Sequence, residues 1–271
     1  MRIQHNISAM NSYRQLGVNN NAMAKNLEKL SSGYRINRAG DDAAGLAISE
    51  KMRAQIKGLE TAQKNANDAI SLVQTAEGAL TEVHSMLNRM SELATQSANG
   101  IYAEGDRDKL QLEVTELIAE IDRIAGSTDF NGTLLLDGNF AQDMQIGAAE
   151  GDTLNIAIDA MDAAGVGVDS VDISGADGST ANGQIETIKT AIDNVSTVRS
   201  QLGAWQNRLE HTINNLGVTA ENMTAAESRI RDTDMASEMM AFTKNNILNQ
   251  AAQSMLAQAN QVPQGVLQLL Q

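Results

Sequence analysis

The sequence predicts a mainly α-helical protein in which long antiparallel coiled-coil helices and paired terminal helices accompany a small β-hairpin region. Aromatic residues make up 3% of the chain, and proline occurs once in 271 residues, so little interrupts long helices. Apolar residues recur at three- and four-residue spacing in both halves of the chain, which is typical of helical seams. The segment between the two halves has glycine-containing turn pairs and short alternating strands instead.

The amino-terminal half carries three helical patterns. Apolar residues from Ile3 to Leu30 predict an amphipathic helix that ends near Gly33. A second pattern predicts one long helix over residues 44–99, and a third predicts a helix over residues 106–126. No proline lies in any of these ranges, so each helix is expected to be continuous.

Residues 130–183 are expected to form β-hairpins and exposed acidic turns. The pairs Asn131-Gly132 and Asp137-Gly138 are turn signals, and the alternation through Leu154, Ile156 and Ile158 is typical of a strand. The stretch from Gly165 to Gly183 is rich in Gly, Asp, Ser and Ala, which predicts turns with little burial.

Helical periodicity returns in the carboxy-terminal half. The apolar register predicts a second long coiled-coil helix over residues 184–230. A last amphipathic stripe from Leu248 to Leu269 predicts a terminal helix. Each buried apolar side chain contributes about 1.5–3 kcal/mol, so the two terminal stripes are expected to pair with each other, with neighbouring copies, or with both.

Charge and composition exclude several function classes. The net charge of −14 argues against a nucleic-acid partner, because phosphate contacts require clustered Lys and Arg. The first fifteen residues lack the apolar core of a secretory signal, and no apolar run is long enough to cross a bilayer. The chain contains no cysteine, which is in keeping with export across a redox boundary.

Signatures of catalysis, metals and cofactors are missing from the sequence. His5, His84 and His211 are far apart and form no zinc-binding motif. The Gly165-Val166-Gly167 run lacks the third glycine of a nucleotide fingerprint, because Ser170 stands in its place. We therefore expect a protein that is not an enzyme and that holds neither a metal nor a cofactor.

Two stretches resemble the signatures of bacterial flagellins. The first is LEKLSSGYRINRAGDDAAGLAISEKMRAQIKGL at residues 27–59. The second lies near the carboxyl end, with NMTAAESRIRDTD at residues 222–234 and ILNQAAQSMLAQANQVPQGVLQLL at residues 247–270. The resemblance extends through the intervening helices, and this chain is similar to short flagellins that lack the variable outer domains.

The resemblance implies a fold and a function. Residues 1–43 and 232–271 would form an inner core domain, and residues 44–231 an outer core domain. The chain would polymerise into the extracellular flagellar filament after unfolded export through the flagellar type III apparatus. Its implied partners are copies of itself, an export chaperone on the carboxy-terminal helices, and the filament cap and hook-junction proteins. The self-assembly contacts are expected at Ile3, Ile7, Met10, Leu27, Leu30, Leu248, Met255, Val262, Val266 and Leu269.

The resemblance also implies recognition by the host Toll-like receptor for flagellin. The family's receptor-binding motif matches the ten residues from Leu87 to Gln96. Arg89 is the expected anchor, because a guanidinium makes several directional hydrogen bonds. The expected receptor contacts are Arg89, Leu93, Glu113, Leu87, Leu110 and Gln96.

Three alternatives remain open on the sequence alone. A hook-filament junction protein would share the helical ends and the export route. A hydrolase inserted in residues 131–183 would need more residues than that segment has, and the segment contains neither His nor Cys. A membrane-active helical protein would need a positive face, whereas Lys244 is the one basic residue after Arg231.

Overall fold

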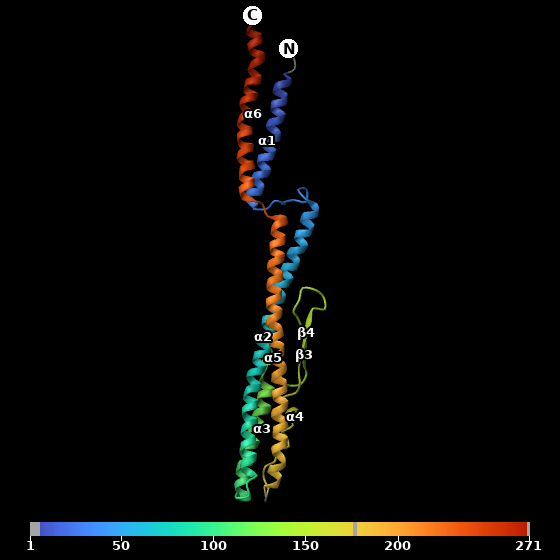
Figure 1. The fold of residues 1–271 in the computed structure, drawn as a ribbon, viewed down its shortest axis with the longest axis vertical. Coiled ribbons are helices and arrows are strands. Elements are labelled where there is room, and N and C mark those ends of the chain that lie inside the picture. The colour runs from blue at the N-terminus through green and yellow to red at the C-terminus, as the bar shows by residue number, and fades with distance from the viewer. Residues whose placement is uncertain (1–5, 176–177, 270–271) are drawn as a thin grey trace. The chain divides into compact units, whose positions relative to one another are not determined.

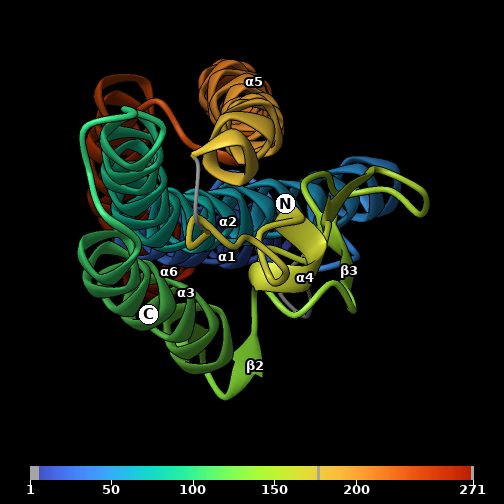
Figure 2. The same cartoon turned by 90° about the horizontal axis from the view of Figure 1, so that it is seen from below.

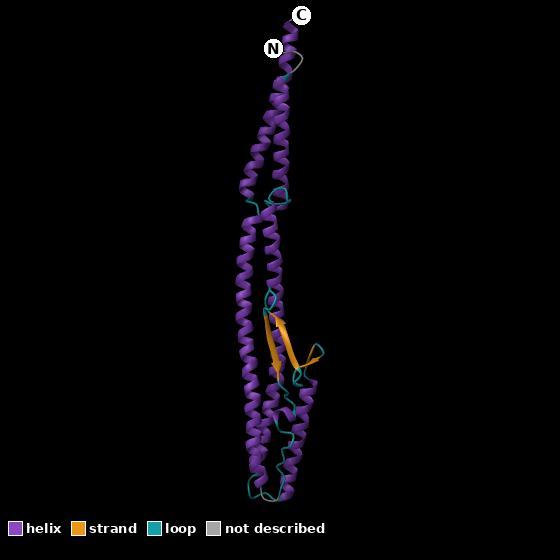
Figure 3. Cartoon of the chain, turned by 90° about the vertical axis from the view of Figure 1, so that its right-hand side faces the viewer, coloured by secondary structure: helices purple, strands orange, loops and turns teal. Residues whose placement is uncertain are grey.

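The computed structural model describes residues 6–175 and 178–269, with side chains described up to residue 261. Its helices are α1 (Ile7–Ser32), α2 (Ala43–Ser97), α3 (Glu104–Ser127), α4 (Ala163–Val166), α5 (Ser179–Arg231) and α6 (Met235–Leu269), as Figure 1 shows. The strands are β1 (Asp129–Phe130), β2 (Thr133–Leu134), β3 (Phe140–Gln145) and β4 (Thr153–Ile158), which Figure 3 colours orange. The predicted mainly α fold with long helices and a small antiparallel β region is confirmed.

The chain divides into two compact units. Unit 1 comprises residues 1–56 and 221–271, and unit 2 comprises residues 57–220. Helices α2 and α5 contribute residues to both units. These unit boundaries differ from those expected for the inner and outer core domains, which are at residues 43/44 and 231/232. The expected domains are defined by their roles in a filament, and they stay a prediction.

Unit 1 contains the paired terminal helices. Helices α1 and α6 lie side by side and antiparallel (Figures 1 and 3), and Asn6 Nδ2 near the start of α1 donates to the Ala259 carbonyl oxygen far along α6 at 2.8 Å. Asn6 also caps α1, because its side chain accepts from the Ala9 amide. Gly33 ends α1 in the left-handed conformation, with φ of 75°. The helix therefore ends where the sequence predicted.

The connectors that follow α1 and α5 are joined to each other. Tyr34 and Asp232 form an antiparallel bridge, with Arg35 N donating to the Arg231 carbonyl oxygen at 2.7 Å. The Arg231 guanidinium also stacks over the Tyr34 ring, 4.8 Å from its centroid. Backbone pairing and stacking therefore hold the two connectors of unit 1 together.

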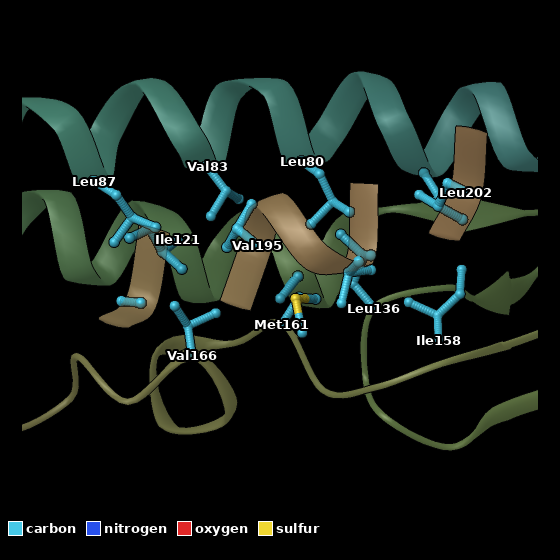
Figure 4. Close-up of a cluster of buried hydrophobic side chains, with 14 of the residues drawn as sticks. Leu80, Val83, Leu87, Ile121, Leu136, Ile158, Met161, Val166, Val195 and Leu202 are labelled. Atoms are coloured by element: carbon cyan, nitrogen blue, oxygen red, sulfur yellow. The ribbon is translucent and has the colours of Figure 1, made fainter. Parts of the chain in front are cut away.

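The hydrophobic core of unit 2 lies where α2, α3 and α5 meet. Figure 4 shows Leu80, Val83 and Leu87 of α2 pointing toward side chains of α3, α5 and the segment that follows β2. Figure 2, seen along the helices, shows α3 and α5 beside α2. The apolar seams predicted for these helices are the residues that the core buries, and this burial is the main source of the unit's stability.

The predicted hairpins are present. Asn131 and Gly132 both have positive φ, 53° and 79°, and form the two-residue turn between β1 and β2. Strands β3 and β4 pair in antiparallel register from Phe140↔Ile158 to Gln145↔Thr153. On β4 the alternate residues Leu154, Ile156 and Ile158 are buried, as the sequence pattern predicts.

The expectation of little burial over residues 165–183 is wrong for the apolar residues of this segment, whereas Asp169 and Asp172 are exposed. Val166, Val168, Val171 and Ile173 are buried in the core of unit 2, and α5 begins at Ser179, inside the predicted turn region. Side chains from the neighbouring helices satisfy the polar backbone of this segment, as a buried loop requires. Ser97 Oγ donates to the Ile173 carbonyl oxygen at 2.6 Å, and Gln111 Oε1 accepts from Ile173 N at 2.7 Å.

Candidate functional site

The terminal helix pair exposes large apolar side chains. Met10 and Met255 are 67% and 62% exposed, and Ile7, Leu27 and Leu248 are exposed as well. Of the other expected self-assembly residues, Leu30 is half-buried. Ile3 lies outside the described residues, as do the side chains of Val262, Val266 and Leu269.

Further exposed apolar residues on the same two helices were not predicted, because the periodicity predicted a single apolar stripe on each helix. They are Tyr13, Val18, Met235, Met239, Met240 and Ile247. Exposed apolar residues gathered at this density mark an interaction surface, because leaving them in water is costly. We call the exposed apolar residues of α1 and α6 the terminal apolar surface.

The second candidate site is a charged cluster that joins α2 to α3. Arg89 Nε donates to Glu113 Oε1 at 2.7 Å, and Arg89 Nη1 donates to Glu92 Oε2 at 3.0 Å. Hydrogen bonding to Glu113, and next to Glu92, raises the pKa of the Arg89 guanidinium above its ordinary value. All three side chains are well exposed, so the cluster is accessible to a partner.

The structure divides the expected receptor residues between surface and core. Gln96 is exposed and donates to Tyr102 Oη at 3.0 Å, and Leu110 is half-buried beside the core. Leu87 and Leu93 are buried in the core, with Leu93 only 1% exposed. As a correction to the expected site, these two side chains present no surface to a receptor, because they lie on the side of α2 that packs into the core of unit 2, whereas the Arg89 side chain is exposed.

The described part of the chain lacks two features that other function classes require. Among the described residues, no group of three or more His, Asp or Glu is placed to hold a metal ion. No helix in the described ranges is both long and apolar enough to cross a membrane. Residues 131–173 are built into the hairpins and the core of unit 2, rather than into a domain of their own.

Each helical half of the chain matches a region of one known protein family. Residues 3–141 match the bacterial flagellin N-terminal helical region, and residues 185–270 match the bacterial flagellin C-terminal helical region. This chain belongs to the bacterial flagellin family. That family is a structural one, and flagellar filament proteins are among the chain's relatives.

Similarity to individual flagellins extends over the whole chain. It is 55% identical to the flagellin of Halalkalibacterium halodurans and 51% identical to that of Bacillus subtilis, with 100% of both chains covered in each comparison. It is 50% identical to a flagellar filament core protein of Treponema maltophilum, again with 100% of both chains covered. Full-length matches at this chain length identify a short flagellin.

Solved structures agree with this assignment. The crystal structure of Bacillus cereus flagellin is 37% identical, with a TM-score of 0.51 over 60% of this chain and 94% of that one. A putative flagellar hook-associated protein from Vibrio parahaemolyticus has a TM-score of 0.62 at 14% identity, covering 71% of this chain and 100% of that one. At that identity the second likeness shows a shared fold alone.

Proposed function

We propose that the chain polymerises into the flagellar filament through the terminal apolar surface. The exposure of Met10, Met255 and their neighbours carries this proposal. Burying each such side chain against another subunit contributes about 1.5–3 kcal/mol, so a few per subunit outweigh the cost of association. Residues 1–43 and 232–271 then act as the inner core domain, and residues 44–231 act as the outer core domain.

The route to the filament follows from the same surface. The chain leaves the cell unfolded through the flagellar type III apparatus, without an enzymatic role, and folds as it joins other copies outside the cell. Before export, an export chaperone covers the apolar face of α6, which includes the exposed Leu248 and Met255. At its two ends the filament contacts the cap and the hook-junction proteins.

Substitution of an exposed methionine tests the assembly proposal. Met255→Lys places a charge on the terminal apolar surface and is expected to slow seeded filament growth at least tenfold, because the charge loses water when the surface is buried. Met255→Leu is the matched control and should grow normally. Light scattering measures growth, and negative-stain electron microscopy measures filament length.

The terminal apolar surface would lose its role if charged variants still polymerised. Normal growth by Met255→Lys and by Met10→Lys would give that result. The circular dichroism spectrum and the denaturant unfolding curve are measured for each variant. Both should be unchanged, since these side chains are exposed and lie outside unit 2.

We propose a second role for the monomer, as a ligand of the host Toll-like receptor for flagellin. The exposed pair of Arg89 and Glu113 is the observation that favours it. Arg89 would anchor the receptor, with Glu113 beside it and Gln96 farther along α2, while Leu87 and Leu93 support the site from beneath. Receptor signalling by the Arg89→Ala monomer, compared with that of the parental monomer, is the test.

A further inference from the structure

The contact face between α1 and α6 has an unusual composition for a helix pair. Most half-buried positions of α1 fall in an unbroken three-four spacing, and so do most of the less exposed positions of α6. We call these residues the terminal seam. On α1 they are Ala9, Ser12, Leu16, Asn19, Met23, Asn26 and Leu30, and on α6 they are Glu238, Phe242, Asn245, Asn249, Ala252, Leu256 and Ala259.

A polar residue recurs along the α1 side of the terminal seam with a heptad period. Ser12, Asn19 and Asn26 are each seven residues apart, and an apolar residue separates each from the next. No residue of α1 is fully buried. Asn249, only 6% exposed, is the one polar residue of α6 that is buried among those whose side chains are described.

Several asparagines bridge the two helices directly. Asn249 Nδ2 donates to Asn20 Oδ1, at the edge of the terminal seam, and Gln253 Nε2 donates to Asn249 Oδ1 at 3.3 Å. Oriented with its nitrogen toward Glu238, the Asn26 amide donates to Glu238 Oε1 at 3.1 Å and accepts from Asn245 Nδ2 at 3.2 Å. We call Asn20, Asn26, Asn245 and Asn249 the asparagine ladder.

These bonds specify one antiparallel register. Shifting α6 by one heptad along α1 would place Asn249 opposite Tyr13 or Leu27 instead of Asn20. The hydrogen bond from Asn249 Nδ2 to Asn20 Oδ1 would then be lost. A buried amide without a partner costs about 1–3 kcal/mol, and Asn249 is the member of the ladder that is buried. Polar residues at coiled-coil seam positions act in this way, selecting a register at some expense of stability.

The asparagine ladder also distinguishes the terminal seam from the terminal apolar surface on the same helices. A seam made only of Leu, Ala and Met would accept any amphipathic helix, including the terminal apolar surface of another copy. An amide-containing seam rejects such a surface, because a purely apolar face leaves the amides without partners. The chain's own α6 supplies those partners.

We propose that the asparagine ladder determines pairing specificity in the terminal helices. It directs the seam of α1 to the same chain's α6 in a single register and leaves the terminal apolar surface for neighbouring copies. The first half of this inference concerns contacts within one chain, and it is tested in the filament, where the chain is folded. The second half rests on the proposed function above.

Cross-linking of introduced cysteines tests the register, because the chain has no cysteine of its own. Leu16→Cys with Ala252→Cys reports the observed register, and Leu16→Cys with Ala259→Cys reports a slip of one heptad. A short bis-maleimide is applied to filaments of the full chain. Denaturing gels then separate monomers with an internal link from linked dimers.

The two asparagine-to-leucine changes should alter the outcome. With the ladder intact, the 16/252 pair should react at least tenfold more than the 16/259 pair, and within one chain. In the Asn26→Leu, Asn249→Leu background, the two pairs should react to within about twofold of each other, and linked dimers should appear. Asn21→Leu and Gln250→Leu, at exposed positions next to members of the ladder, are the matched controls and should keep the original preference.

Two results would overturn the proposal. One is a single register in the doubly substituted chain, and the other is equal reaction of both pairs in the parental chain. Helix content is measured in parallel and should not fall in the leucine variant, because an apolar seam pairs at least as strongly. A fall would mean that the amides only stabilise the pair. Electron microscopy of the same samples shows whether filaments formed, so a failure of assembly would be seen separately.

Discussion

The Arg107 guanidinium on α3 donates to the Gly175 carbonyl oxygen at 3.0 Å, which fixes the segment before α5 against the end of α2. The same side chain donates to the Ser97 carbonyl oxygen at 2.9 Å and to that of Asn99 at 3.3 Å. Arg107 is only 1% exposed. One buried cation therefore satisfies carbonyl groups from two separate segments of unit 2.

Replacing Arg107 should destabilise unit 2. Arg107→Met keeps most of the volume but leaves buried carbonyl groups without donors, so the free energy of unfolding should fall by about 2–4 kcal/mol. Arg107→Lys, which keeps the charge but has fewer donors, should fall between this variant and the parent. Urea denaturation followed by circular dichroism measures the change.

An exposed neighbour supplies the control for Arg107. Lys109→Met removes a cation that is paired with Asp106 at the surface, and it should change the free energy of unfolding by no more than about 0.5 kcal/mol. If Arg107→Met is no less stable than Lys109→Met, the buried hydrogen bonds contribute nothing to the stability of unit 2.

The sequence predicted the helices well because their apolar periods coincide with burial. The predicted helix over residues 44–99 corresponds to α2 at Ala43–Ser97, and the predicted turn at Asn131-Gly132 is present. The segment around Val171 was mispredicted, because isolated apolar residues among Gly and Asp have no period. Its burial depends on polar groups of Ser97, Arg107 and Gln111, which are distant in the sequence.

The candidate sites were predictable to a lesser extent. The resemblance located Arg89 and Glu113, but periodicity alone could not show that Leu93 faces the core. The terminal seam was not predicted, because the predictions rest on the spacing of apolar residues. Ser12, Asn19 and Asn26 are polar, although their heptad spacing is visible in the sequence.

The revised burial of residues 131–183 leads to a labelling prediction. This segment is expected on the outer surface of the filament, but only at its exposed positions. Asp169→Cys should react with a maleimide in intact filaments, whereas Val168→Cys should be protected at least tenfold, because Asp169 is exposed and Val168 is buried. Mass spectrometry quantifies both reactions.

An inversion of the labelling pattern would contradict the proposed arrangement. Ser254 lies on α6, between residues of the terminal apolar surface, so Ser254→Cys should react in the monomer and become protected in the filament. Reaction at Ser254→Cys in filaments, together with protection at Asp169→Cys, would place the terminal helices outside instead.

The connector before α2 should depend on pH through Asp41. Hydrogen bonds from the Arg38 and Asn37 amides to this carboxylate lower the pKa of Asp41 below its ordinary value of 3.8. A lowered pKa means that the stabilisation is present above about 3.8 and is lost as the pH falls through the folded-state value. Acidification should therefore loosen the turn, and Asp41→Asn should remove this pH dependence.

Amide hydrogen exchange measures the turn directly. Between about pH 5 and pH 2, protection at Asn37 and Arg38 should fall in the parental chain, after correction for the intrinsic effect of pH on exchange. Asp42 lies beside Asp41 and caps α2 by accepting from the Gly45 amide, so Asp42→Asn serves as the neighbouring control. A pH response that persists in Asp41→Asn would assign the effect to another group.

Receptor recognition should depend on Arg89 more than on any comparable arginine of unit 2. Arg89→Ala removes an exposed guanidinium that Glu113 and Glu92 hold in place, and it should reduce the potency of the monomer in a receptor reporter assay at least tenfold. Arg123→Ala is the matched control, because Arg123 is also exposed and bound to a carboxylate, that of Glu120. Its potency should stay within about twofold of the parent.

Stability cannot account for such a difference between the two variants. Exposed ion pairs contribute about 0–1 kcal/mol, so both variants should keep the parental helix content and unfolding midpoint. Glu113→Gln separates two roles, since it removes the charge that orients Arg89 but leaves the guanidinium available. It should lose less potency than Arg89→Ala if Glu113 mainly positions the arginine. Equal potency for Arg89→Ala and the parent would remove Arg89 from the site, and silence from the parental monomer would show that this flagellin escapes the receptor.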